Sequence, residues 1–279
     1  MSSTIPTSSV ISVEIEGHVA TLWLDRPEAL NAMGPELFED LPVIVRALDA
    51  DDGVRAIVVA AKGRHFTAGL DLVAMGPLLM GGGGGGASSP AERNAAMVAN
   101  IHGLQEAMSV FADIDTPTIA AVHGACIGGG VDLIAACDVR FASAEATFSV
   151  RETKMAIVAD LGSLQRLQRI LGHGLVNELA LTGKDLDAAR ALEIGLLNGC
   201  AETPEDAYAL ARACAEEIAA NSPLVVRGTK RVLRESASRP IDEGLELVAQ
   251  WNALYLRSKD LDEAIGAFLE KRPARFEGR

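Results

Sequence analysis

The chain has 279 residues, of which 49% are hydrophobic and 23% are charged. This length and composition predict one large globular unit with a substantial hydrophobic core. The chain has 25 basic and 38 acidic residues, which gives a formal net charge of −13. A protein with this charge lacks the positive field that attracts phosphate backbones, so the composition excludes a nucleic-acid partner.

The cysteines and the apolar runs indicate a compartment. The chain has four cysteines and no CxxC pair, which predicts buried thiols in a reducing environment. The most apolar long run, residues 117–137, is interrupted by His123 and Asp132, and the first residues are polar. We therefore expect no membrane span and a cytoplasmic protein. The four cysteines are Cys126, Cys137, Cys200 and Cys214.

Strands and helices alternate in the N-terminal half. Alternating apolar residues on either side of Gly17 predict a β-hairpin, and apolar residues at helical spacing or in short continuous runs predict the elements that follow. Such alternation predicts an α/β core with right-handed crossover connections. The expected elements are a hairpin of residues 10–15 and 18–24, a helix over 34–50, a strand over 54–61, a helix over 90–111 and a strand over 118–122.

The C-terminal half is predicted to be mostly helical. Strands are expected to end near residue 142, and Gly, Asn, Pro and Asp separate the helical segments after it. One of these segments carries four basic residues on a single face, for which we expect solvated surface, with ligand binding as the alternative. The basic residues are Arg227, Lys230, Arg231 and Arg234. The expected helices lie near 161–172, 174–182, 187–192, 204–220, 224–237 and 241–270.

A glycine-rich turn followed by an acid is the main chemical signal. Glycines 128–130 follow an apolar strand and precede a helical pattern that contains Asp132, so the backbone N–H groups of a helix start would face this turn. Glu152 and Asp160 lie downstream and complete a set of three carboxylates suited to proton transfer. The alternative is a purely structural turn with Asp132 as a first-turn helix acid.

A second glycine turn follows the predicted strand over 54–61. In it, Asp71 fits a helix N-cap, and the turn exposes the amide of Leu70. Two such turns at the carboxyl edge of one parallel sheet can bring two N–H groups together as an oxyanion hole. The run Gly81–Gly86 predicts a mobile loop rather than a phosphate-binding loop, because no Gly-Lys-Ser/Thr follows it.

Four segments together resemble the crotonase, or enoyl-CoA hydratase/isomerase, superfamily, and the resemblance covers nearly the whole chain. It implies an α/β spiral of ββα units over residues 1–200 and a helical C-terminal region over 201–279. That region forms trimers in the family, and trimers often pair, so the resemblance implies a homotrimer or homohexamer. The segments are Arg26-Pro-Glu-Ala-Leu-Asn-Ala-Met, Gly63-Arg-His-Phe-Thr-Ala-Gly-Leu-Asp, Ala120-Ala-Val-His-Gly-Ala-Cys-Ile-Gly-Gly-Gly-Val-Asp-Leu and Ala267-Phe-Leu-Glu-Lys-Arg.

The resemblance also implies roles for individual residues. The amides of Leu70 and Gly129 match the family's oxyanion hole, which binds the thioester oxygen of an acyl-CoA. Five further positions match contacts to the coenzyme A moiety, which is part of the substrate, so no separate cofactor is expected. No HExxH motif or cluster of metal ligands occurs, and no metal is expected. The coenzyme A positions are Ala29, Leu30, Ala68, Phe268 and Lys271.

The three acids indicate a particular reaction. Asp132 and Glu152 match the paired acids of hydratases, although hydratases usually have Glu where this chain has Asp132. Together with Asp160 they resemble the dienoyl-CoA isomerases, in which a proton moves between carbons too far apart for one carboxylate. We therefore expect isomerisation of 3,5-dienoyl-CoA to 2,4-dienoyl-CoA in fatty-acid β-oxidation. The alternatives are hydration of 2-enoyl-CoA and a non-catalytic acyl-CoA-binding subunit. His65 and His123 have no nucleophile motif beside them, so structural roles are expected.

Overall fold

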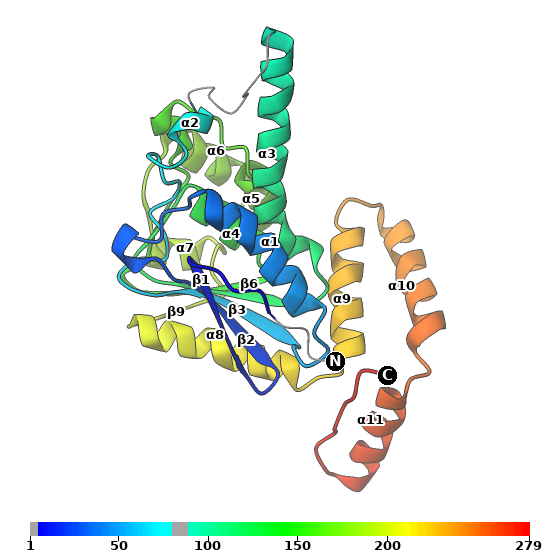
Figure 1. Ribbon diagram of the computed structural model, residues 1–279. Helices are drawn as coiled ribbons and strands as arrows, with labels where there is room; N and C mark the ends of the chain where they lie inside the picture. Colours follow the sequence, from blue (N-terminus) through cyan, green and yellow to red (C-terminus); the bar gives the residue numbers. More distant parts are fainter. Residues whose placement is uncertain (1–4, 80–88) are drawn as a thin grey trace.

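A computed structural model describes residues 5–79 and 89–279 (Figure 1). The predicted loop Gly81–Gly86 lies outside the described residues. The strands of a six-stranded sheet are β1 (Ile11–Glu16), β2 (Val19–Leu24), β3 (Ala56–Ala61), β4 (Thr118–Val122), β6 (Val139–Ser143) and β9 (Gly199–Ala201). A three-stranded sheet consists of β5 (Ala125–Ile127), β7 (Thr147–Ser149) and β8 (Leu186–Asp187).

The helices complete the regular secondary structure of the described residues. They are α1 (Pro35–Asp49), α2 (Gly76–Leu79), α3 (Pro90–Asp113), α4 (Gly129–Ala136), α5 (Ser163–Ile170), α6 (His173–Thr182), α7 (Ala188–Glu193), α8 (Pro204–Ala219), α9 (Pro223–Ser236), α10 (Ile241–Tyr255) and α11 (Lys259–Glu270). Two 3-10 turns, η1 (Pro27–Ala29) and η2 (Glu152–Met155), lie beside the candidate site. No helix in the described part of the chain is long and apolar enough to cross a membrane.

The large sheet has the predicted parallel core. Its strand order is β1-β2-β3-β4-β6-β9, and only the β1–β2 hairpin is antiparallel among its pairs. Gly17 forms the hairpin turn with a φ of 60°, which explains the glycine there. In the sequences β4-β5-α4 and β6-β7-α5, the first strand joins the large sheet and the second joins the small one. This is the strand, strand, helix spiral that the sequence predicted.

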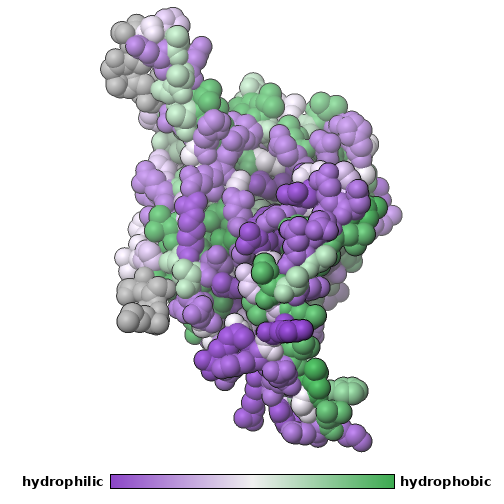
Figure 2. Space-filling view, turned by 90° about the vertical axis from the view of Figure 1, so that its right-hand side faces the viewer, coloured by the Kyte–Doolittle hydropathy of each residue, from purple (hydrophilic) through white to green (hydrophobic). Residues whose placement is uncertain are grey.

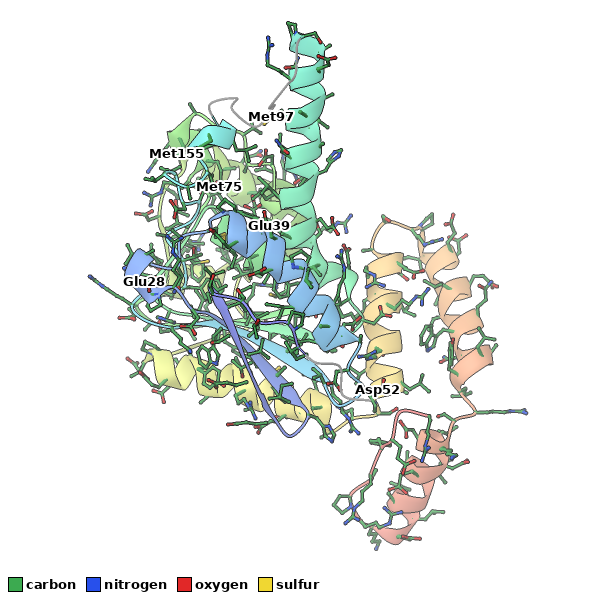
Figure 3. All side chains as sticks on the ribbon, viewed as in Figure 1. Glu28, Glu39, Asp52, Met75, Met97 and Met155 are labelled. Atoms are coloured by element: carbon green, nitrogen blue, oxygen red, sulfur yellow. The ribbon has the colours of Figure 1, made fainter. Side chains whose placement is uncertain are left out.

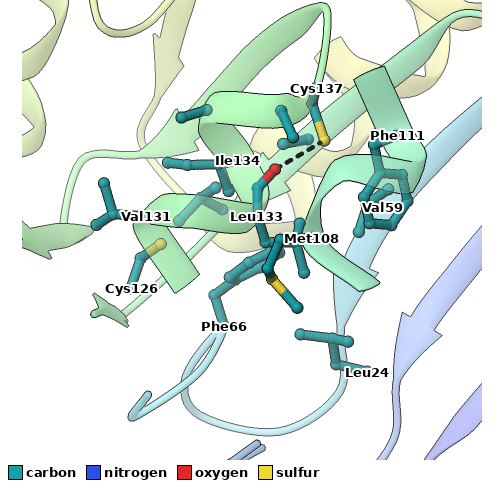
Figure 4. Close-up of a cluster of buried hydrophobic side chains, with 14 of the residues drawn as sticks. Leu24, Val59, Phe66, Met108, Phe111, Cys126, Val131, Leu133, Ile134 and Cys137 are labelled. Atoms are coloured by element: carbon teal, nitrogen blue, oxygen red, sulfur yellow. Dashed lines mark hydrogen bonds between the residues drawn. The ribbon is translucent and has the colours of Figure 1, made fainter. Parts of the chain in front are cut away.

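Helices cover both faces of the large sheet (Figure 1). On one face α8 presents an alanine every fourth residue, so its backbone approaches the Val and Ala side chains of β3 and β4 closely. On the other face α1, α3 and α4 enclose the larger hydrophobic core, part of which is shown in Figure 4. The division of the chain at residue 200 stays a prediction.

Two predictions about the C-terminal half were wrong. Strands do not end near residue 142, because β7, β8 and β9 follow; each has only two or three residues, too few to show a period in the sequence. The single helix expected over 241–270 is two helices. Ser258 ends the run by accepting a hydrogen bond of 3.2 Å from the backbone N–H of Leu261 and so caps α11.

The basic residues of α9 are only partly solvated: Arg231 is exposed, whereas Lys230 and Arg234 bind main-chain carbonyls. Lys230 is only 7% exposed, and its Nζ donates to the carbonyl oxygens of Phe111 and Thr116, each at 2.9 Å, and lies 2.8 Å from a carboxylate oxygen of Asp138. Arg234 binds the carbonyls at the end of α3 in the same way. The bonds to residues 111–113 satisfy carbonyls at the end of α3, and together with the bond to Thr116 they fix α9 to the body.

Candidate active site

Three elements carry the three predicted acids. Asp132 lies in the first turn of α4, Glu152 begins η2, and Asp160 lies in the segment between η2 and α5. Asp132 is 1% exposed, and Glu152 and Asp160 are half-buried. The charges of Asp132 and Asp160 both act on Glu152, so the structure brings the three carboxylates into one electrostatic group. Their catalytic roles stay a prediction.

Burial changes the acidity of all three groups. It raises the pKa of Asp132 to about 6, against the hydrogen bond from the Ser163 amide, and the charge of Asp160 adds to the rise. It raises the pKa of Glu152 to about 7, where the negative charges of Asp132 and Asp160 contribute further. Burial also raises the pKa of Asp160. With pKa values of about 6 and 7, Asp132 and Glu152 can both accept and return protons near neutral pH.

Two carboxylate oxygens are available for chemistry. The backbone N–H of Ser163 donates to Oδ1 of Asp132 at 2.5 Å. Oδ2 of Asp132 and Oε2 of Glu152 are buried and have no hydrogen-bond partner among the residues that the structure describes. A buried oxygen without a partner is costly unless it holds a proton or meets a ligand, which is consistent with a reactive group.

The glycine run at the start of α4 is required by three neighbours. A Cβ at Gly128, whose φ is 54°, would lie 3.2 Å from Oε1 of Glu152. At Gly129 it would lie 2.9 Å from Sδ of Met33, and at Gly130 it would lie 2.4 Å from Cγ2 of Thr67. This turn therefore lies against one of the three acids, and the choice between a structural and a catalytic role for it stays a prediction.

The two predicted oxyanion amides follow paired segments. Thr67 forms a parallel bridge with Cys126; its N–H donates to Ala125 O at 2.9 Å, and its carbonyl accepts from Ile127 N at 3.2 Å. After this pairing, the first segment continues to Leu70 and the second segment continues to Gly129. No hydrogen bond from the N–H of either residue is found within residues 5–79 and 89–279. Their role as an oxyanion hole stays a prediction.

The first coenzyme A positions lie together. Leu30 has a left-handed φ of 54°, and its carbonyl accepts from the amide of Ala68 at 3.0 Å, while Ala29 ends η1 directly before it. Leu30 is 46% exposed, so this strip faces solvent. Sequence reasoning missed the residue that holds it. Asn31 is 4% exposed, and its side-chain amide donates to the carbonyls of Lys62 and His65 at 2.9 and 2.8 Å.

The C-terminal coenzyme A positions lie elsewhere in the single chain. Phe268 is 82% exposed near the end of α11, and Lys271 follows as its left-handed cap. In Figure 3, Glu28, the neighbour of Ala29, lies at the opposite side of the molecule from α11. One chain therefore does not bring Phe268 and Lys271 to the strip of Ala29, Leu30 and Ala68.

Both motif histidines form hydrogen bonds with backbone groups, which is the structural role that the sequence predicted. Nδ1 of His65 accepts from the Ala125 amide at 3.0 Å, and Nε2 of His123 lies 2.9 Å from the carbonyl oxygen of Gly63. Asp71 also has a structural role, because its Oδ1 accepts from the amide of Ala74 at 3.0 Å and Arg26 binds its other oxygen. These contacts join the two glycine loops without entering the group of acids.

Comparison with known proteins places this geometry in a family. Residues 14–279 match the family model described as enoyl-CoA hydratase/isomerase. A mitochondrial Delta(3,5)-Delta(2,4)-dienoyl-CoA isomerase from Dictyostelium discoideum is 42% identical over 258 residues, covering 92% of this chain and 87% of its own length. A peroxisomal enzyme of the same name from Arabidopsis thaliana is 38% identical, covering 97% and 96%.

A solved structure agrees. The crystal structure of a putative enoyl-CoA hydratase from Streptomyces coelicolor A3(2) superposes with a TM-score of 0.88 at 30% identity, covering 98% of this chain and 96% of its own. The chain belongs to the enoyl-CoA hydratase/isomerase family.

Proposed function

We propose that this protein isomerises 3,5-dienoyl-CoA thioesters to their 2,4-dienoyl isomers. The observation that carries the proposal is that Asp160, a third carboxyl group with a raised pKa, acts electrostatically on the pair Asp132 and Glu152. Relatives at 42% and 38% identity bear the name of this activity. The coenzyme A portion enters as part of the substrate, so the reaction uses no separate organic cofactor.

The reaction moves one proton and three electron pairs. Glu152, with a pKa of about 7, removes a proton from carbon 2 of the 3,5-diene, and that C–H pair is delocalised onto the thioester oxygen as a dienolate. When carbon 6 is protonated, the pair returns and forms the new double bond between carbons 2 and 3. The bond between carbons 3 and 4 moves to carbons 4 and 5. The pair from carbons 5 and 6 takes a proton from Asp160 at carbon 6. Transfer of a proton from Glu152 back to Asp160 then restores the starting state, so nothing is consumed.

The proposed oxyanion hole lowers the energy of the intermediate. Removal of the carbon 2 proton places negative charge on the thioester oxygen. The amides of Leu70 and Gly129 would donate to this oxygen, and because both are fixed by the fold, they need no reorganisation as the charge develops. Loss of one such donor costs roughly 10²- to 10³-fold in rate.

Hydration of 2-enoyl-CoA is the second candidate. It is favoured by the free Oδ2 of Asp132 and Oε2 of Glu152, which could hold a water molecule between them. Hydration needs only two acids, however, and leaves Asp160 without a task. The isomerase proposal gives all three carboxyl groups a function.

Asp160→Asn distinguishes these reactions. With 3,5-dienoyl-CoA, the unmodified protein should produce the conjugated 2,4-dienoyl absorbance, and the variant should lose roughly 10²- to 10⁴-fold of that rate because the acid at carbon 6 is gone. In D₂O the variant should still exchange the carbon 2 proton. Hydration of 2-enoyl-CoA without dienoyl isomerisation by the unmodified protein would favour the second candidate.

An assembly of three or six copies is part of the proposal. The face of α11 formed by Leu261, Ile265 and Phe268 is 37%, 52% and 82% exposed in one chain, and Figure 2 shows apolar surface on the projecting lower part of the molecule. Burying such a face against another copy would remove it from water. Sedimentation equilibrium should give a trimer or hexamer.

For the compartment we propose the cytoplasm. The relatives above are named mitochondrial and peroxisomal, so cell fractionation is needed to check this proposal.

A further inference from the structure

The segment that carries Asp160 has no regular structure of its own. Residues 156–162 connect η2 to α5 without a helix or strand. An aspartate side chain is short, so the position of its carboxyl group depends directly on the backbone. Something outside the segment must therefore fix where Asp160 stands.

One side chain of α3 and one of α5 hold this segment at two successive carbonyl groups. Nε2 of Gln105 donates to the carbonyl oxygen of Asp160 at 2.7 Å. One residue later, Nη1 of Arg166 donates to the carbonyl oxygen of Leu161 at 3.2 Å, and its Nη2 donates to Oγ of Ser109 at 2.7 Å. Gln105 and Ser109 lie four residues apart on one face of α3, so this helix contacts the Asp160 carbonyl directly and the Leu161 carbonyl through Arg166 of α5.

We propose that Gln105 is a positioning residue, which acts through the main chain of Asp160 to set the place of that carboxyl group in the reaction. This inference rests on the proposed isomerase function. Among the residues that the structure describes, Gln105 donates to the Asp160 carbonyl and to no carboxylate oxygen, so it acts through the backbone and not as an acid or base.

Loss of Gln105 should slow the proton transfer from Asp160 to carbon 6 and leave the proton transfer from carbon 2 to Glu152 unchanged. Glu152 is held by different contacts: its carbonyl accepts from the amide of Ile157 at 3.0 Å, and its Oε1 faces Gly128. Loss of the Gln105 bond would release Asp160 but leave Glu152 in place. Misplacement of a reacting group by about 1 Å can cost roughly 10²-fold in rate.

The test compares two rates in each variant. Gln105→Met keeps the length of the side chain and removes the N–H donor, and Gln105→Glu replaces the donor with a carboxylate. Gln168→Met is the matched control, because Gln168 also donates from Nε2 to a backbone carbonyl, that of Leu164 at 2.8 Å, on the exposed face of α5. Isomerisation of 3,5-dienoyl-CoA and deuterium exchange at carbon 2 are measured in D₂O, together with the melting temperature.

We expect both Gln105 variants to lose roughly 10- to 100-fold of the isomerisation rate. Carbon 2 exchange should stay within about threefold of the unmodified protein, and Gln168→Met should change neither rate. Equal loss of exchange and isomerisation in both Gln105 variants, or no loss of isomerisation, overturns the positioning role. Absence of isomerisation in the unmodified protein overturns the proposed function itself, which the same assay reveals before any variant is compared.

Discussion

The amide of Ser163 and the carboxylate of Asp132 are joined by a hydrogen bond of 2.5 Å from N to Oδ1. Ser163 is the first residue of α5, so the positive end of that helix faces one oxygen of the acid, while Oδ2 stays without a partner among the described residues. Asp132 thus connects the start of α5 to the acid group. This position suits an acid that adjusts its neighbours more than one that carries the proton itself.

Asp132→Asn should shift the pH dependence of Glu152. The negative charge of Asp132 contributes to the raised pKa of Glu152, so its removal lowers that pKa. The acid limb of carbon 2 exchange should therefore move to lower pH, while Asn still accepts from the Ser163 amide. Exchange measured by mass spectrometry across pH 5 to 9 checks this. Asp52→Asn, an exposed control, should not move the limb, and an unmoved limb in Asp132→Asn would contradict the coupling.

The two reactions of the unmodified protein should have different pH profiles. Glu152 has a pKa of about 7, so its basic form and the rate of carbon 2 exchange should rise through pH 7 and then level off. Isomerisation also needs a proton on Asp160, so its rate should fall again on the alkaline side. Because the acids interact, each limb belongs to the group rather than to one residue. Superimposable profiles would argue against two separate acids.

Glu152→Gln should stabilise the fold at alkaline pH. The pKa of Glu152 is about 7 in the folded protein and 4.5 ordinarily, so between these values the folded state retains a proton that the unfolded state has released. Stability is therefore lost as pH rises through this window. Urea unfolding at pH 8 should show the variant more stable by about 2 kcal/mol, with the difference shrinking toward pH 4. A gain of equal size at both pH values would contradict this cause.

Two substitutions of Gly129 distinguish the role of its backbone N–H from the role of its missing side chain. Gly129→Pro removes the N–H at the first position of α4, where proline is tolerated, whereas Gly129→Ala keeps it and meets Sδ of Met33 at 2.9 Å. The proline variant should lose roughly 10²- to 10³-fold more activity than the alanine variant. Exchange and isomerisation should fall together, because both pass through the dienolate. Equal activity of the two variants would exclude this amide from the oxyanion hole.

Lys230→Ala should destabilise the protein without touching the acids. The change leaves the carbonyls of Phe111 and Thr116 and one oxygen of Asp138 without their buried cation, at a cost of about 2 to 3 kcal/mol. Arg231→Ala, on the exposed side of the same helix, should cost less than about 0.5 kcal/mol. Chemical denaturation measures both. Similar losses for the two variants would mean that α9 is not anchored through Lys230.

Local patterns explain which parts of the fold could be predicted. The hairpin, the buried strands and the two glycine turns have periods or turn residues within a few positions, so the sequence was sufficient for them. The burial of Lys230 was not predicted because its partners lie more than 90 residues away, in α3 and directly before β6. Gln105 was missed for the same reason, since its bond to Asp160 spans 55 residues and leaves no local mark.

The glycine run of α4 has a consequence for how the site tolerates change. Gly128, Gly129 and Gly130 are approached by a carboxylate, a thioether and a methyl group that come from three different parts of the chain. Because the glycines have no side chain between their backbone and these three groups, a displacement of any one group directly moves the start of α4. The positions of Glu152, Met33 and Thr67 relative to α4 are therefore set in a single place, and a substitution at any of the three glycines should disturb them jointly.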